Sequence, residues 1–329
     1  MSRRRALVTG ASGFIGANLA RRLAADGHAV TATCRPGADL WRLQDATGLD
    51  VRALDIDDEQ AVDALIDDVR PQWAFHMAAH GAYSWQTDTR QIFATNLLGT
   101  VNLIGACRRG RACEAFVHAG SSSEYGFKDH APDEDDALAP ASAYAVAKAA
   151  ATLYGRQAAG AGDAMRVVTL RLYSVYGPYE DPRRLIPALV VRGLRGELPP
   201  LVDPDVARDF VCVQDVVRAL LLAAAGAAHG TVYNVGSACQ TTIREIVQIT
   251  RTALELEAEP QWGSAAQRTW DTTTWISRTD RIRRDLGWEP QIALDEGFRA
   301  MVTWLRGAGD AVAGVYDAAH LDLSGKLAG

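Results

Sequence analysis

Short apolar runs alternate with amphipathic stretches along most of the chain. The apolar runs are rich in β-branched residues and predict strands at 6–9, 29–34, 51–55, 73–76, 114–118, 166–171 and 232–235. The stretches between them predict helices, including 17–23, 58–69, 85–109, 142–160 and 214–225. This alternation favours right-handed βαβ units and therefore a doubly wound parallel sheet. Ligands of such sheets bind at the carboxyl ends of the strands.

A glycine-punctuated turn follows the first strand. Gly10 lets the chain turn tightly, Gly13 leaves room for a phosphate beside backbone N–H groups, and Gly16 lets the next helix pack closely on the strand. The helix N-terminus adds free N–H donors and the positive end of its dipole. The turn therefore predicts a dinucleotide-binding site.

The end of the second strand bears on which dinucleotide is bound. An acidic residue often stands there and accepts hydrogen bonds from the adenosine ribose, but here the position is Cys34 and Arg35 follows. A guanidinium pairs with a 2′-phosphate, whereas a carboxylate would repel it. These residues favour NADP(H) and leave NAD(H) open.

A serine cluster and a Tyr–Lys pair carry the candidate chemistry. Ser121 and its neighbours end the fifth strand, while Tyr144 and Lys148 lie four apart and so share one face of a helix. An ammonium near a phenol favours the phenolate and lowers its pKa. Together these groups suit proton transfer at a carbinol while a hydride moves to or from nicotinamide.

Composition excludes several other classes of function. The chain has 329 residues and a net charge of −6, so it offers no basic footprint for nucleic acid. No apolar run is long enough to span a bilayer, and the basic N-terminus leads straight into a strand. Five cysteines without metal or disulfide spacing favour reduced thiols, and hence a cytoplasmic protein that uses no metal.

Several ordered motifs resemble one family. They are the glycine turn, His76-Met77-Ala78-Ala79, Asn96 with Gly99-Thr100, the serine loop ending in Tyr125-Gly126, Tyr144 with Lys148, and Leu170-Arg171 leading to Tyr176-Gly177-Pro178. The set is similar to that of the extended short-chain dehydrogenase/reductase superfamily, in its nucleotide-sugar epimerase, dehydratase and reductase branch. The resemblance covers nearly the whole chain, to about residue 305.

The resemblance implies roles for individual residues. Tyr144 would be the acid/base, Lys148 would bind the nicotinamide ribose, and Ser121 would be the catalytic hydroxyl. The implied cofactor contacts are Gly10, Gly13, Phe14, Ile15, Gly16, Arg35, Asp55, Ile56, Ala78, Ala79, Tyr144, Lys148, Tyr173 and Val175. The implied contacts to a nucleotide-diphosphate sugar are Ser122, Ser123, Ser174, Arg184, Arg208 and Arg268.

The chain also departs from this family. Its dehydratases carry an acid/base pair where this chain has Ser122 and Ser123, and serine has no suitable pKa for that work. Glu124 is one residue late and would need an unusual turn to reach the site. Ser174 replaces an asparagine that commonly contacts the substrate.

Two chemistries use the remaining catalytic set. The favoured prediction is NADPH-dependent reduction of an NDP-4-keto-6-deoxyhexose at C4, because Arg35 favours NADP and the serine loop resembles that of GDP-4-keto-6-deoxymannose reductases. The alternative is an NDP-sugar 4-epimerase with tightly bound NAD. A 4,6-dehydratase and a non-catalytic dinucleotide-binding protein remain further alternatives.

The predicted organisation is a Rossmann-type doubly wound sheet with a smaller C-terminal α/β substrate lobe. Residues 1–175 with 209–235 would form the dinucleotide-binding domain, and 176–208 with 236–306 the lobe. Residues 307–329 are rich in glycine and alanine and predict a loosely packed tail without assigned structure. The resemblance further implies a homodimer, formed through the helices predicted at 85–109 and 142–160.

Overall fold

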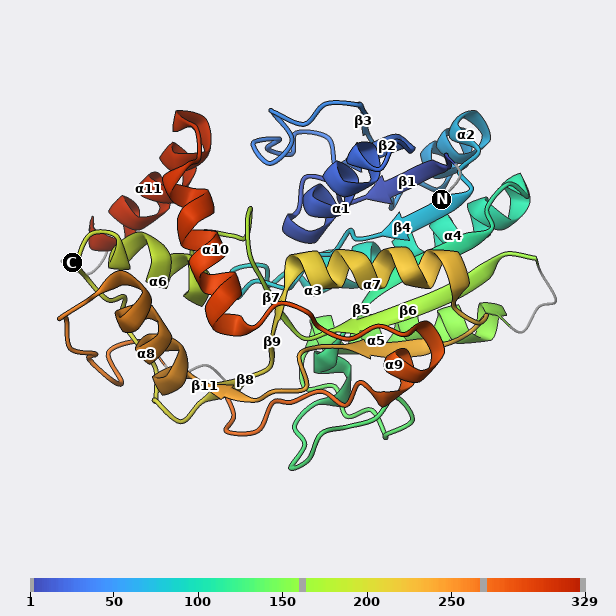
Figure 1. Cartoon of the computed structure of the whole chain (residues 1–329). Coiled ribbons are helices and arrows are strands. Elements are labelled where there is room, and N and C mark those ends of the chain that lie inside the picture. Colours follow the sequence, from blue (N-terminus) through green and yellow to red (C-terminus); the bar gives the residue numbers. More distant parts are fainter. Residues whose placement is uncertain (1–2, 160–163, 267–270, 326–329) are drawn as a thin grey trace.

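The computed structural model describes residues 3–159, 164–266 and 271–325, and it is built on a seven-stranded parallel sheet (Figure 1). The strand order is β10-β6-β5-β4-β1-β2-β3. These strands are β1 (Arg5–Thr9), β2 (Ala29–Cys34), β3 (Leu49–Ala53), β4 (Trp73–His76), β5 (Ala115–Ser121), β6 (Arg166–Leu172) and β10 (Val232–Val235). Every neighbouring pair is parallel, which confirms the predicted doubly wound fold.

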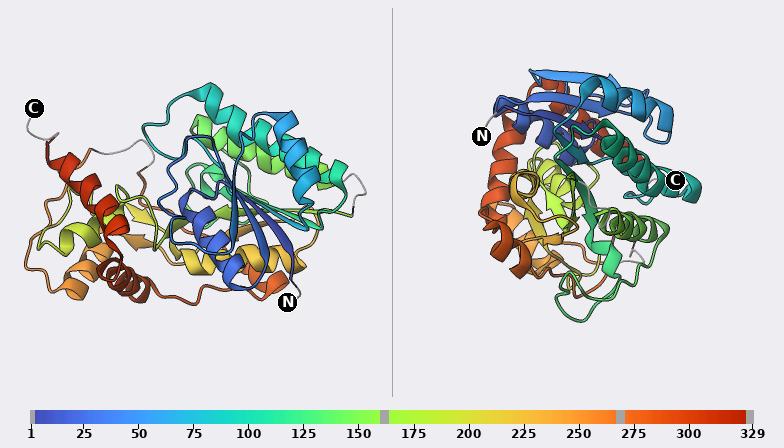
Figure 2. Two further views of the ribbon diagram at one scale, coloured as in Figure 1. Left: turned by 90° about the horizontal axis from the view of Figure 1, so that it is seen from above. Right: turned by 90° about the vertical axis from the view of Figure 1, so that its right-hand side faces the viewer.

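Helices cover both faces of this sheet (Figure 2). One face carries α1 (Phe14–Ala25), α7 (Val213–Gly226) and α9 (Asp280–Leu286). The other carries α2 (Glu59–Val69), α4 (Gly99–Gly110) and α5 (Ala143–Ala159). Because both faces are covered, the central strands read as continuous apolar runs: all the residues of β4 and four of the five in β1 are buried. In the described part of the chain, no helix is long and apolar enough to cross a membrane.

The helix predicted at 85–109 is shorter and is interrupted. The Asp88 carboxylate accepts hydrogen bonds from the backbone N–H groups of Arg90 and Gln91 and so caps α3 (Thr89–Phe93), which leaves 85–88 in a loop. A π-helical turn, η1 (Ala94–Leu98), joins α3 to α4. Within it Asn96 donates to the carbonyls of Ile92 (2.8 Å) and His80 (2.6 Å), and thereby fixes the segment that follows β4.

A second lobe packs beside the carboxyl ends of the strands, at the left of Figure 1. Its helices are α6 (Leu185–Gly193), α8 (Ile243–Leu254), α10 (Leu294–Arg306) and α11 (Asp310–Gly325). Two small sheets join it to the rest: β7 (Ser174–Tyr176) pairs with β9 (Phe210–Cys212), and β8 (Ala207–Arg208) pairs with β11 (Thr241–Thr242). Its apolar side chains, such as Leu189, Ile246 and Met301, form a buried cluster of their own.

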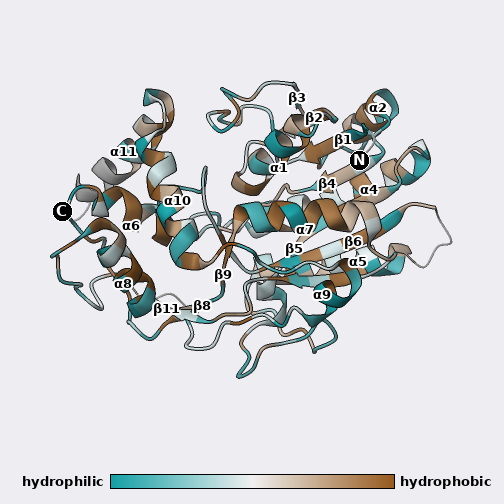
Figure 3. Cartoon of the chain, in the orientation of Figure 1, coloured by the Kyte–Doolittle hydropathy of each residue, from teal (hydrophilic) through white to brown (hydrophobic). Residues whose placement is uncertain are grey.

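Helix α11 lies where no structure was predicted. Its Tyr316 is 1% exposed, packs edge-on against Trp41 and Trp304, and donates a hydrogen bond to the carbonyl of Glu180 (2.7 Å). The tail is therefore packed through a few aromatic contacts. The sequence did not predict this helix because its hydrophobic pattern is weak: in Figure 3, α11 is paler than the strongly hydrophobic α6.

Candidate functional site

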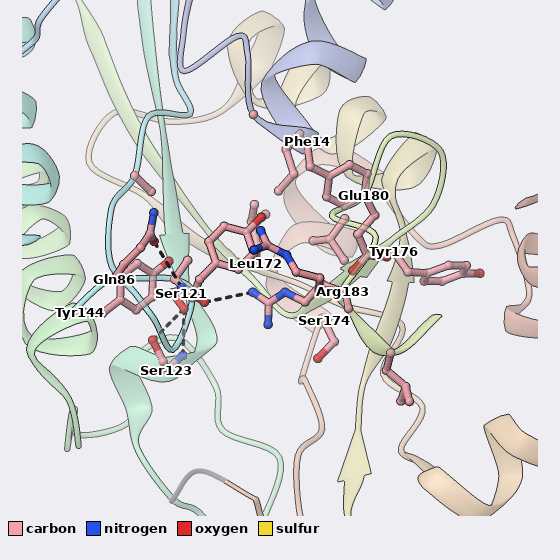
Figure 4. Close-up of a pocket in the computed structure, with 18 of the residues that line it drawn as sticks. Phe14, Gln86, Ser121, Ser123, Tyr144, Leu172, Ser174, Tyr176, Glu180 and Arg183 are labelled. Atoms are coloured by element: carbon pink, nitrogen blue, oxygen red, sulfur yellow. Dashed lines mark hydrogen bonds between the residues drawn. The ribbon is translucent and has the colours of Figure 1, made fainter. Parts of the chain in front are cut away.

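A cavity of about 1130 Å³ lies at the carboxyl ends of β1, β4, β5 and β6, between the sheet and the second lobe (Figure 4). Sheet-end segments and the N-terminus of α1 form one wall, while α6 and the segments before β8 form the other. All the predicted site residues line this cavity except Arg268, which falls outside the described residues. The location is that expected for ligands of a doubly wound sheet.

The glycine turn has the geometry of a dinucleotide cradle. Gly10 has φ +68°, and a Cβ there would lie 2.5 Å from the Ala78 backbone nitrogen. A Cβ on Gly16 would lie 2.3 Å from the Gly10 carbonyl oxygen. No side chain caps α1, so the N–H groups of its first turn, which begins at Phe14, remain available on the cavity wall. These residues fit the pyrophosphate of a dinucleotide.

The other end of this wall would hold the adenosine. Asp55, Ile56 and Arg35 line it, and a Cβ on Gly99 would lie 2.6 Å from the Ile56 side chain, which accounts for that glycine. Cys34 is 4% exposed and packs in the sheet core, so its side chain is withdrawn from the cavity. Arg35 is exposed at the cavity wall. In the described ranges, no three metal-ligating side chains come together.

The structure brings together Ser121, Tyr144 and Lys148. Ser121 ends β5 and caps the short helix η2 (Ser122–Tyr125), and its Oγ lies 2.8 Å from Ser123 Oγ. Tyr144 and Lys148 project from α5 into the same cavity. Lys148 Nζ donates to the Ala119 carbonyl (3.0 Å) and lies 6.0 Å from the Tyr144 ring centroid. The end of strand β5 and helix α5 thus converge on one point.

The expected electrostatic effect of Lys148 on Tyr144 requires a correction. Burial raises the pKa of Tyr144 to about 12, and the opposing influence that this structure provides is chiefly a hydrogen bond with Ser121. Burial also lowers the pKa of Lys148 to about 8, against the attraction of Glu124. The spacing along the helix correctly placed Tyr144 and Lys148 on one face. The effect of burial on the Tyr144 pKa, however, is larger than the lowering expected from the Lys148 charge.

Glu124 is completely buried and turned away from the cavity. Its Oε1 accepts hydrogen bonds from the Ser121 backbone N–H (2.8 Å) and the Thr152 hydroxyl (3.1 Å). Its Oε2 accepts one from Arg171 Nε (2.8 Å). The carboxyl therefore holds the serine loop in place and lies outside the cavity lining, in line with the expectation that Glu124 would need an unusual turn to reach the site.

The predicted substrate side also meets at the cavity. Ser122, Ser123 and Ser174 line it together with Tyr173 and Val175. Arg184 donates to the Ala82 carbonyl (3.0 Å), and Arg208 pairs with Asp271 (2.7 Å). Both guanidiniums line the cavity, where they could pair with a diphosphate, although Asp271 offsets the charge of Arg208.

Two loops contribute residues that the sequence did not reveal. Tyr83 and Trp85 stack with centroids 4.6 Å apart in the loop after β4, and the Arg183 guanidinium lies 3.8 Å from the Trp85 centroid. Glu180 lines the cavity from the loop before α6. The alternating aromatic and polar residues at 83–86 could have indicated a ligand-contacting loop. The prediction of a helix from residue 85 concealed this pattern.

Comparison with known proteins gives consistent matches over this architecture. The sequence model described as the NAD dependent epimerase/dehydratase family matches residues 6–236. The chain is 31% identical to a UDP-glucose 4-epimerase of Mycolicibacterium smegmatis, over 92% of this chain and 98% of that one. It is 28% identical to a dTDP-glucose 4,6-dehydratase of Neisseria gonorrhoeae, over 91% and 94%. The solved structure of MoeE5 in complex with UDP-glucuronic acid and NAD has a TM-score of 0.81 and 32% identity, over 92% and 98%.

Proposed function

Since the chain belongs to the NAD-dependent epimerase/dehydratase family, we propose that it is a nucleotide-sugar 4-epimerase that acts on a UDP-hexose with tightly held NAD. One observation carries this proposal. The cavity holds Ser121, Tyr144 and Lys148 together, while the loop positions that would supply a dehydratase acid are serines and Glu124 points into the core.

The residues of the chain act on the C4 hydroxyl of the sugar. Tyr144 takes the hydroxyl proton and later returns it, and Ser121 hydrogen-bonds the same oxygen and supports the phenolate. Lys148 carries positive charge below its pKa of about 8. Because burial alone keeps Tyr144 protonated, the proposed reaction requires this charge to act together with the Ser121 hydrogen bond on the phenolate. The glycine turn, Asp55 and Ile56 would hold NAD, whose chemistry when bound is reversible hydride transfer at C4.

The choice of epimerase over reductase rests on the comparisons and on the cofactor. The named relatives are epimerases and dehydratases, and the family description specifies NAD. The reductase prediction rested on Arg35 as a sign of NADP and on the likeness of the serine loop to that of GDP-4-keto-6-deoxymannose reductases. Because Arg35 is exposed at the cavity wall, it is compatible with either adenosine ribose, and we propose NAD.

Product and cofactor analysis tests this proposal. We expect the purified protein to release NAD on denaturation and to convert UDP-glucose into UDP-galactose without added cofactor. Mass spectrometry identifies the cofactor, and NMR identifies the sugar. A product lighter by one water would indicate a dehydratase instead. Turnover of a 4-keto sugar only with added NADPH would restore the reductase.

We further propose that the protein is a homodimer formed through α4 and α5, which pack against each other. Three large apolar side chains on these helices and η1 are exposed, namely Leu98 (55%), Val146 (39%) and Leu153 (53%). Val146 and Leu153 are seven residues apart on α5 and share one face. Such a cluster is typical of an interface.

Charge on this face should dissociate the dimer. Leu153→Glu combined with Val146→Glu is expected to give a monomer by light scattering, because two carboxylates would be buried at the interface. Leu194→Glu, placed on an exposed residue of the second lobe, is the matched control and should remain dimeric. A wild-type protein that is monomeric at micromolar concentration would refute the interface.

A further inference from the structure

Glu180 lines the cavity and carries a buried carboxyl oxygen without a hydrogen-bond partner in the described part of the chain. The residue is 8% exposed and lines the cavity. Its Oε2 has no hydrogen-bond partner among the residues that the structure describes. Buried polar atoms are almost always paired, so an unpaired carboxyl oxygen at a ligand cavity calls for a donor from the ligand.

The neighbouring acid on the same loop differs from Glu180 in this respect. Asp181 is also buried, but its two carboxylate oxygens accept hydrogen bonds from Arg183 at 2.9 Å and 2.7 Å. Among the described residues, the Glu180 carboxyl has no arginine paired with both of its oxygens, and burial raises its pKa to about 8, although Arg184 and a hydrogen bond from the Gly177 backbone oppose the shift. A donor in the cavity would relieve this desolvation.

The loop that carries Glu180 is fixed from three directions. Tyr316 of α11 donates to the Glu180 carbonyl (2.7 Å), Arg42 donates to the Tyr179 carbonyl (2.7 Å), and Asn18 of α1 donates to the Pro178 carbonyl (2.9 Å). These bonds fix the backbone of the loop and do not use the Glu180 carboxyl. The carboxyl is therefore preorganised, as a specificity contact requires.

The position of Glu180 points to the sugar end of the cavity. Figure 4 places Glu180 on the wall across from Ser121 and Tyr144. The Arg184 guanidinium and the Tyr83 hydroxyl lie within electrostatic reach of both Tyr144 and Glu180. A sugar ring whose C4 hydroxyl meets Tyr144 would thus present another of its groups toward Glu180.

We propose that Glu180 is a specificity-determining residue that accepts a hydrogen bond from a hexose hydroxyl other than the one at C4. The inference rests on the proposed function, because it takes the ligand to be a nucleotide sugar. It predicts that the substrate is a nucleotide sugar whose hexose carries a free hydroxyl where the ring faces Glu180. A site built around such a contact rejects an analogue that lacks the hydroxyl, since the buried carboxyl is then left unpaired.

The contact is tested by a double-mutant-type cycle, in which changes to Glu180 are combined with deoxy analogues of the substrate. The holoenzyme and its Glu180→Ala and Glu180→Gln variants are assayed with UDP-glucose and its 2-deoxy, 3-deoxy and 6-deoxy analogues. With the wild type, one analogue should lose about tenfold or more in kcat/KM. With Glu180→Ala the same analogue should lose nothing further relative to UDP-glucose, because the partner is already gone. Glu180→Gln should lie between, since its amide oxygen still accepts a hydrogen bond.

The controls separate this contact from folding and from cofactor binding. Glu296→Gln removes an exposed carboxylate of α10 and should leave all the ratios unchanged. Equal deoxy effects in the wild type and in Glu180→Ala would overturn the inference while the proposed function stands. Loss of bound NAD in Glu180→Ala, with unchanged deoxy ratios, would assign the carboxyl to the cofactor instead. A wild type that holds NAD but turns over no nucleotide sugar would overturn both proposals.

Discussion

Tyr144→Phe is expected to lower kcat by roughly 10²- to 10⁴-fold, the usual contribution of a positioned acid/base. The substitution removes only the hydroxyl that exchanges a proton with the sugar, and the ring stays packed on α5. Bound NAD and the unfolding temperature should therefore remain near the wild-type values. Steady-state kinetics with UDP-glucose measure the loss, and full turnover by this variant would refute the catalytic assignment.

Lys148→Met provides a companion control that distinguishes catalysis from stability. Burial lowers the pKa of Lys148 from 10.5 in the unfolded chain to about 8, so folding works against its charge. Between these two values the unfolded state binds more protons, and wild-type stability should rise with pH across that range. The variant should lack this rise, lose activity, and unfold no more readily than the wild type at neutral pH.

Arg171→Met is expected to reduce the free energy of unfolding by about 3–5 kcal/mol, because it leaves the buried Glu124 carboxylate without its charged partner. Arg171 also donates to the Tyr125 hydroxyl (2.7 Å) and the Glu134 carbonyl (3.2 Å), so other polar groups lose a partner too. Chemical denaturation measures the change.

The double variant Arg171→Met with Glu124→Leu separates the ion pair from general damage to the core. With both charges gone, part of the lost stability should return. The kcat of the double variant should fall below the wild-type value, however, because the Ser121 backbone N–H loses its Glu124 acceptor. If Arg171→Met alone were as stable as the wild type, the claim that Arg171 stabilises the buried Glu124 carboxylate would be refuted.

Much of the fold could be predicted because it follows from local periodicity. The alternation of strands and helices determined the parallel sheet, and the glycine spacing placed the turn at the end of β1. The i, i+4 spacing of Tyr144 and Lys148 put both into one cavity with Ser121. These features depend on chain geometry over a few residues, which a single sequence displays directly.

Other features depend on what is packed around a residue, and no short pattern displays that. Spacing indicated that Lys148 lies near Tyr144, but the pKa of Tyr144 follows from burial by distant segments. Glu180 owes its unpaired oxygen to the surroundings of a loop, and α11 is held by aromatic partners far away in the sequence. The reductase and epimerase alternatives share one catalytic set, so the residues alone could not separate them.

The fate of the C4 hydrogen tests the central claim most directly. UDP-glucose carrying deuterium at C4 is incubated with the purified holoprotein and no added cofactor, and the product is examined by NMR and mass spectrometry. A 4-epimerase returns the hydride to the same sugar carbon, so UDP-galactose should form with its deuterium retained at C4. UDP-galactose without the label, or a dehydrated product in its place, would contradict the proposed reaction.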